Sequence, residues 1–492
     1  MLFNSYIFIL CFLPITLIGW FSLNRIKNEN VSKVFLLIMS LVFYAYFNIR
    51  YLPIILISIL VNYSLYLLLQ KRIIPSLRKL VLIFGILLNV GLLFYYKYLG
   101  FFTENINAVF HADFVVKRLL LPLGISFFTF QQLSFVIDCY KSDIKDCSLL
   151  NYALFVSFFP QLIAGPIVLY DEMIPQFADT KNKRFNSENF SKGLFVFSLG
   201  LGKKVLVADP LGNLANIGFG NIPSLNSSTA LISMLAYTLQ IYFDFSGYCD
   251  MAIGIGYMFN IDIPINFNSP YRALDMNDFW KRWHITLTRF LTKNLYIPLG
   301  GNRKGKMRTY VNQMIVFLVS GIWHGANWTF ILWGALNGIS VILSKILSPF
   351  SEKLKKKARF LPWLVTFVFI NLMWVVFRAD SIQLAGLFYQ KLFSLRFGAV
   401  DSAYLNALFT SEFSFIGKVV TKVLAVDEAK IKAIFAFAFF LFATVASVLF
   451  KNTSEQAKRF KPNFWRLAVS CALLVWSVLS FSGVSTFLYF NF

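Results

Sequence analysis

The sequence is poor in charged residues, in acidic residues above all, and in cysteine. Only 14% of its 492 residues are charged, and 23 Asp and Glu stand against 46 Lys and Arg. So little charge argues against an ordinary water-soluble enzyme, about a quarter of whose residues are charged. The five cysteines form no CxxC pair and lie mostly in apolar runs. We therefore expect them to pack as small hydrophobic side chains, not to form a disulfide framework.

Apolar runs recur along the whole chain, and 58% of its residues are hydrophobic. Residues 52–69 and 119–137 are examples. A bilayer core of about 30 Å is crossed by about 20 helical residues. We therefore predict an all-α polytopic membrane protein with roughly 11–13 transmembrane or re-entrant helices. No long polar stretch remains for a soluble domain, so residues 1–492 are expected to form a single membrane unit.

The net charge of +23 lies mainly in the connections between apolar runs. Lysine and arginine are enriched in alternate connections, as the positive-inside rule expects of cytoplasmic loops. This pattern places both termini and the connection over residues 97–118 outside the cytoplasm. The same pattern indicates that the protein is surrounded by membrane lipid. We expect no nucleic-acid partner, because the sequence has no basic module interleaved with aromatic residues.

The longest uncharged stretch, residues 310–344, contains His324. As one straight helix it would be about 50 Å long, which is more than a membrane requires. The stretch is therefore expected to break at Gly325-Ala326-Asn327, directly after the histidine. Because basic residues flank both ends, we predict a hairpin that enters from the cytoplasm, returns to it, and holds His324 well inside the membrane.

His324 is the first candidate for catalysis. A neutral imidazole can accept a proton from an alcohol or phenol near neutral pH. Its neighbours Trp323 and Asn327 offer an indole and an amide that could orient the ring. The alternative is a buried histidine that only links helices by hydrogen bonds. Ionisable groups inside membranes usually mark functional sites, which favours the catalytic interpretation.

Two other polar segments are candidates for supporting roles. His284 follows a mixed segment of charge and tryptophan, which either anchors the protein at the interface or lines a pore. Asp244 and Asp250 stand six residues apart beside an apolar run, where they either bind a cation or form a structural network between helices. Two histidines without a third ligand at a suitable spacing predict no metal site.

Four motifs occur in order: Gln-Leu-Ile-Ala-Gly-Pro-Ile at 161–167, and the segments 242–250, 266–291 and 323–328. Together they resemble the membrane-bound O-acyltransferase family, in the bacterial branch that serves alginate O-acetylation. The resemblance spans most of residues 120–380 and leaves residues 381–492 as C-terminal helices with an aromatic tail. It implies a ring of tilted helices around a thin centre, with His324 as the catalytic residue and His284 as a second characteristic polar position.

The resemblance further implies acyl transfer across a bacterial inner membrane. Acetyl-CoA is the expected cytoplasmic donor, and its phosphates would suit a basic mouth for which the candidates are Lys203, Lys204, Lys281 and Arg282. The acceptor would be a cell-envelope polysaccharide, reached through an extracytoplasmic SGNH-type O-acetyltransferase or esterase. A composition rich in Lys, Ile, Asn and Phe suggests an AT-rich genome, which favours peptidoglycan over alginate or another exopolysaccharide.

The C-terminal residues 487–492, Phe-Leu-Tyr-Phe-Asn-Phe, allow two interpretations. They form an aromatic belt at the outer interface, or Tyr489 accepts the acyl group, as is proposed for a similar tail on the small partner protein of teichoic acid D-alanylation. A phenyl ester is reactive enough for an acyl carrier, and His324 could activate the phenol. Outside the enzyme class, a transporter or flippase with His324 and Asp244 as a proton relay, and a structural scaffold, are the alternatives.

Overall fold

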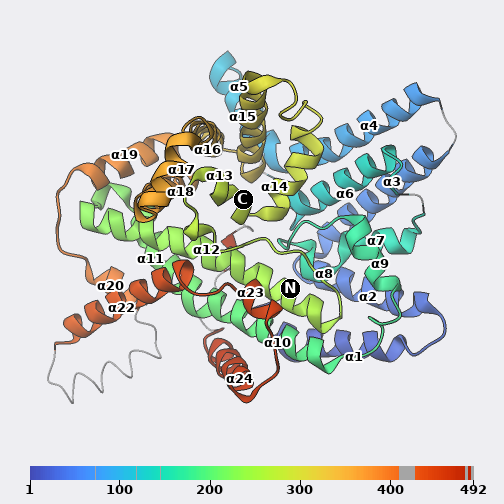
Figure 1. Ribbon diagram of the computed structural model, residues 1–492. Coiled ribbons are helices and arrows are strands. Elements are labelled where there is room, and N and C mark those ends of the chain that lie inside the picture. Colours follow the sequence, from blue (N-terminus) through green and yellow to red (C-terminus); the bar gives the residue numbers. More distant parts are fainter. Residues whose placement is uncertain (72–73, 118, 145, 409–426, 482–485, 489–492) are drawn as a thin grey trace.

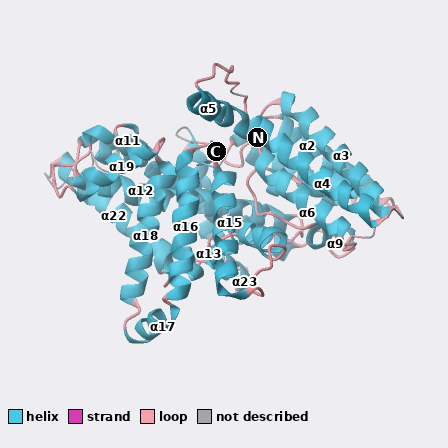
Figure 2. Ribbon diagram, turned by 90° about the horizontal axis from the view of Figure 1, so that it is seen from above, coloured by secondary structure: helices cyan, strands magenta, loops and turns pink. Residues whose placement is uncertain are grey.

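The computed structural model describes residues 1–71, 74–117, 119–144, 146–408, 427–481 and 486–488. These residues form helices and loops (Figure 2), and their β-type pairing is limited to an isolated bridge between Phe267 and Trp283. The prediction of an all-α protein is confirmed.

The first half of the chain contains the following α-helices: α1 (Leu13–Leu23), α2 (Glu29–Ala45), α3 (Leu52–Gln70), α4 (Pro75–Leu93), α5 (Leu99–Phe110), α6 (Ile125–Tyr140), α7 (Leu149–Ser157), α8 (Phe159–Leu162), α9 (Tyr170–Ala178), α10 (Ser187–Gly202), α11 (Asp209–Gly220) and α12 (Ser227–Met258). The second half contains these: α13 (Met276–Arg282), α14 (Ile285–Leu291), α15 (Gly305–His324), α16 (Trp328–Ile346), α17 (Ser348–Lys357), α18 (Phe360–Arg378), α19 (Ile382–Phe393), α20 (Ser402–Leu408), α22 (Glu428–Val448), α23 (Thr453–Lys458) and α24 (Phe464–Leu479).

Short π and 3₁₀ segments join or extend several of these helices. The π-helical segments are η1 (Phe8–Phe12), η3 (Phe94–Tyr98), η4 (Lys203–Ala208) and η7 (Thr292–Tyr296), and the 3₁₀ segments are η2 (Ile49–Tyr51), η5 (Ile222–Ser224) and η6 (Pro270–Arg272). A π turn inside a helix often marks a functional position.

Five of the described helical stretches are long and apolar enough to cross a membrane: Ile49–Gln70, Pro75–Phe110, Trp328–Ile346, Phe360–Arg378 and Glu428–Val448. The predicted number of 11–13 embedded segments stays a prediction, because shorter apolar helices can also enter a membrane. One expectation is wrong. Residues 97–110 do not begin a connection, since helix α4 continues through η3 into α5 as far as Phe110.

Helix α12 lies at the centre of the molecule and packs against α10, α11, α18 and α19 (Figure 1). Its contact with α10 is made by glycines. A Cβ atom on Gly193 would lie 2.5 Å from the carbonyl oxygen of Gly254, and one on Gly254 would lie 2.6 Å from the backbone nitrogen of Phe197. Small residues let membrane helices approach to backbone contact, so α10 and α12 pack closely along their length.

Helices α15 and α16 form the predicted hairpin. Helix α15 ends at His324 and α16 begins at Trp328, so the break stands where the sequence placed it. The two helices pack closely, because a Cβ atom on Gly321 would clash with the carbonyl oxygen of Phe330. Helix α16 packs in turn on α18, beside which it stands in Figure 2.

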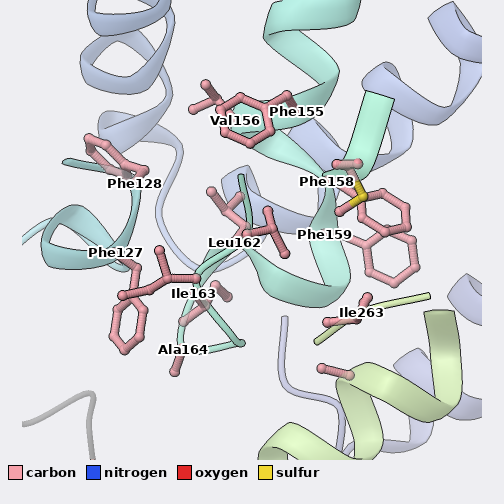
Figure 3. Close-up of a cluster of buried hydrophobic side chains, with 14 of the residues drawn as sticks. Phe127, Phe128, Phe155, Val156, Phe158, Phe159, Leu162, Ile163, Ala164 and Ile263 are labelled. Carbon is pink, nitrogen blue, oxygen red and sulfur yellow. The ribbon is translucent and has the colours of Figure 1, made fainter. Parts of the chain in front are cut away.

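An aromatic core fills the region of the first motif. Phe127 of α6, Phe155 of α7, Phe158 and Phe159 lie around the turn at Leu162–Ala164 (Figure 3). The buried Gln161 amide donates to the carbonyl oxygen of Phe155 at 3.0 Å. This short, buried and irregular segment is tolerated because its polar groups bond inside the protein.

Candidate active site

His324 is the last residue of α15, and the local sequence explains why the helix stops there. Gly325 is extended (φ −168°), and the Asn327 side chain accepts a hydrogen bond from the Thr329 amide at 3.0 Å, which caps α16. Asparagine is among the preferred N-cap residues. The Asn327 side chain also donates to the Asp380 carbonyl at 2.9 Å. These bonds fix the hairpin turn that presents the histidine.

The His324 ring is buried among aromatic side chains and is 4% exposed as a residue. Its centroid lies 4.9 Å from that of Trp323, 5.2 Å from that of Trp333 and 5.2 Å from that of Phe377. On one side the histidine borders a cavity of about 210 Å³. The cavity is lined by Phe47, Tyr51, Lys97, Leu120–Phe127, Ile163, Trp323 and His324. His324 therefore borders a small cavity at the end of a helix.

Lys97, from the π segment η3, holds the end of α15. Its ammonium group donates to the carbonyl oxygens of Trp323 at 2.6 Å and of His324 at 3.0 Å. The last carbonyls of a helix lack partners within the helix and carry its negative dipole end, so a cation is favourable there. The sequence did not point to Lys97 as a site residue. The only hint in the sequence was that Lys97 stands directly after an apolar run.

His284 lies next to the same indole. It separates α13 from α14 in the left-handed conformation, with φ 47° and ψ 52°, and it is buried. Its ring centroid is 5.9 Å from that of Trp323 and 4.9 Å from that of Phe245. The structure thus brings the two predicted histidines to the same tryptophan. A left-handed histidine is uncommon, and such strained residues cluster at functional sites.

The four basic residues predicted at the donor mouth do not gather in one place. Lys203 pairs with Asp250 at 2.6 Å and donates to Thr453 at 2.8 Å. Lys204 is fully buried between two carboxylates. Arg282 pairs with Asp278 on its own helix at 2.7 Å, and Lys281 is exposed. Their role in donor binding stays a prediction.

The carboxylates Asp244 and Asp250 both face the lysines of η4. Asp244 is 2.6 Å from Lys204, and Asp250 is 2.6 Å from Lys203. These pairs tie α12 to the helix formed by α10, η4 and α11. The geometry favours a network between helices over a cation site at this pair, and the residues that the structure describes contain no group of three or more candidate metal ligands.

The end of the chain reaches this network. Residues 486–488 lie against α12, where the backbone N–H of Leu488 donates to Asp244 at 3.0 Å. The Phe487 ring is buried and lies 4.4 Å from the Tyr248 ring. Tyr489, the candidate acyl carrier, is outside the described residues. The sequence alone did not show that the segment before it is held inside the protein.

The described residues thus form a helical membrane protein in which two buried imidazoles lie against one indole, and one of them, His324, borders a cavity. The model of the membrane-bound O-acyltransferase family matches residues 115–382. The chain belongs to this family, and it is an acyltransferase.

Relatives of known name extend over the whole chain. A peptidoglycan O-acetyltransferase of Helicobacter pylori is 41% identical, over 100% of this chain and 98% of the relative. A probable alginate O-acetylase of Pseudomonas aeruginosa is 36% identical, over 82% of this chain and 77% of the relative. A teichoic acid D-alanyltransferase of Streptococcus thermophilus is 28% identical, over 46% and 58%. The acyltransferase family takes the place of the transporter and scaffold alternatives.

Proposed function

We propose that this protein transfers acetyl groups from cytoplasmic acetyl-CoA across the membrane for O-acetylation of peptidoglycan. One observation supports the site most directly: His324 ends the first helix of a membrane hairpin and borders a cavity of about 210 Å³. The full-length similarity to a peptidoglycan O-acetyltransferase supports the choice of polymer. Similarity to alginate O-acetylases over a shorter part of the chain keeps alginate, or another exopolysaccharide, as the second candidate.

His324 is proposed as the general base. The imidazole removes the proton from an attacking hydroxyl, whose oxygen forms a bond to the carbonyl carbon of the thioester. The carbon–sulfur bond then breaks, and the histidine returns its proton to the departing thiolate. Each step conserves the acetyl group and the proton, so neither a metal nor a redox cofactor is required.

His284 and Trp323 are proposed to orient the base. The indole lies near both imidazoles, with its ring centroid 4.9 Å from that of His324 and 5.9 Å from that of His284. Packing on rigid aromatic rings limits the positions that the His324 ring can adopt. Asn327 fixes the turn that follows. A base held in one orientation lowers the entropic cost of the transfer step.

Tyr489 is proposed as the first acceptor. Its phenol would take the acetyl group as an ester and pass it to a hydroxyl of the extracytoplasmic SGNH-type partner, which then modifies the polymer. The support is the position of its neighbour Leu488, which is bonded to Asp244 on the central helix. A phenyl ester transfers its acyl group more readily than an alkyl ester, so the second transfer, from Tyr489 to an alkyl hydroxyl of the partner, is favourable.

We propose that both chain termini lie on the extracytoplasmic side of a bacterial inner membrane. The distribution of basic connections supports this orientation. A contact supports one common side for the two termini: Phe3 and Phe487 pack on the same tyrosine, Tyr248, with ring centroids 4.9 and 4.4 Å from its own. The segments at residues 3 and 487 therefore meet at one place in the fold. Lys203, Lys281 and Arg282 remain the proposed donor-binding residues, of which the exposed Lys281 is the most accessible, whereas Lys204 lies buried between two carboxylates and contacts Thr486.

The experiment is acetyl transfer by the purified protein in proteoliposomes supplied with acetyl-CoA. Mass spectrometry of the C-terminal peptide should find acetylated Tyr489 in the wild type and an unmodified peptide in Tyr489→Phe. Wall peptidoglycan from cells with Tyr489→Phe should lose most of its O-acetyl groups. An unmodified wild-type tail together with full activity of Tyr489→Phe would remove Tyr489 from the mechanism.

A further inference from the structure

A buried cluster of three charges lies beside α12. The Lys204 ammonium is 2.7 Å from the carboxylate of Asp209 and 2.6 Å from that of Asp244. Lys204 is 0% exposed, and both acids are nearly buried. Among the described residues, one lysine thus faces two buried carboxylates. Buried carboxylates are costly unless hydrogen-bond donors reach them.

The chain's own C-terminal segment supplies such a donor. The backbone N–H of Leu488 bonds to the second oxygen of Asp244 at 3.0 Å. Lys204 donates to the Thr486 carbonyl at 3.4 Å and lies 4.7 Å from the centre of the Phe487 ring. The three described residues of the tail therefore each contact the cluster, two through their backbone and one through its ring.

Residues 486–488 lie on the same central helix as the histidine site. Phe487 packs against Tyr248 of α12, and Phe245, three residues earlier on that helix, packs against the His284 ring at 4.9 Å between centroids. The His284 ring shares the Trp323 indole with His324. Tyr489 follows this segment directly in the sequence.

We propose that Lys204 and Asp244 are positioning residues that form a seat for residues 486–488 and so deliver Tyr489 to the active site. The inference rests on the proposed role of Tyr489 as acyl carrier. In this account the buried charges serve neither donor binding nor a cation. They make a directional polar seat in an otherwise apolar interior, where only a segment with a correctly placed N–H and carbonyl can bind.

Hydrogen–deuterium exchange of the full-length protein in nanodiscs tests the seat without acyl chemistry. The C-terminal peptide should exchange slowly in the wild type and at least about tenfold faster in Asp244→Ala, because a hydrogen bond to a buried carboxylate is lost. Asp250→Ala is the matched control, since Asp250 lies on the same helix but pairs with Lys203 and Thr453. Its tail should remain protected. Equal tail exchange in Asp244→Ala and the wild type would overturn the proposal.

A second pair of variants leaves the charge cluster intact, so it tests the seat even if Asp244→Ala does not fold. Leu488→Pro removes the N–H, whereas Leu488→Ala keeps it. Leu488→Pro should release the tail and lower the yield of acetyl-Tyr489 at least about tenfold, and Leu488→Ala should do neither. Equal protection in these two variants would also overturn the seat. A further outcome is that tail exchange responds as predicted while acetyl-Tyr489 is found in neither the wild type nor any variant. That result would support the seat and refute the role of Tyr489 as acyl carrier.

Discussion

The Lys97 ammonium donates a hydrogen bond to the backbone carbonyl of His324 at 3.0 Å, from a helix more than two hundred residues earlier in the chain. The same group holds the Trp323 carbonyl at 2.6 Å. The catalytic candidate is thus fixed through its backbone, at the end of a helix whose terminal carbonyls need a partner. The arrangement makes Lys97 part of the support of the site.

Replacing Lys97 by methionine should lower the rate of acetyl transfer by roughly 10²-fold. The apolar chain is similar in length, but the α15 terminus loses its donor, and a shift of about 1 Å at a reacting group can have an effect of that size. Lys117→Met, at an exposed lysine, is the control and should keep the wild-type rate. Single-turnover transfer from labelled acetyl-CoA measures both. A Lys97→Met rate within twofold of wild type would contradict the supporting role.

Two variants of His284 distinguish the role of its left-handed backbone from the role of its imidazole. His284→Asn should keep the fold, because asparagine tolerates positive φ, whereas His284→Ala should be less stable by about 1–2 kcal/mol. Both should lower the transfer rate, by roughly 10²-fold, since both remove the imidazole. Thermal unfolding in detergent and the transfer assay together measure the two effects. Wild-type activity in His284→Asn would show that only the backbone conformation matters.

The approach of α15 to α16 should tolerate no side chain at Gly321. Gly321→Ala should be less stable by about 1–3 kcal/mol, because the added Cβ meets the Phe330 backbone and forces the helices apart. Gly386→Ala is the matched helical control, since a Cβ there meets no atom within 4 Å. It should be neutral or slightly stabilising. Thermal unfolding in detergent compares them, and equal stability of the two variants would refute the close packing.

The helical class and the hairpin were predictable from the sequence because both follow from local properties. Residues 310–344 are uncharged over a length that no single crossing needs, and Gly325–Asn327 is the point where a helix stops easily. The motifs that resemble the acyltransferase family pointed to His324 and His284, and the fold places both at Trp323.

The surroundings of the site could not be predicted, because they depend on contacts between distant segments. In the sequence, Lys97 appeared to begin a connection between helices. In the structure the helix continues through η3, and the Lys97 side chain contacts the end of α15. Lys204 was expected to bind donor phosphates, yet it lies buried between Asp209 and Asp244. A sequence shows where charges stand along a helix but does not show which side of the helix meets the core.

The most direct test of the central claim is acetyl transfer from acetyl-CoA by His324→Gln in proteoliposomes. Glutamine keeps a polar side chain but cannot act as a base. His111→Asn is the control, because His111 is exposed at the end of α5 and asparagine suits its left-handed backbone. The account predicts a loss of at least about 10²-fold for His324→Gln with unchanged unfolding temperature, and wild-type transfer for His111→Asn. Wild-type transfer by His324→Gln would contradict it.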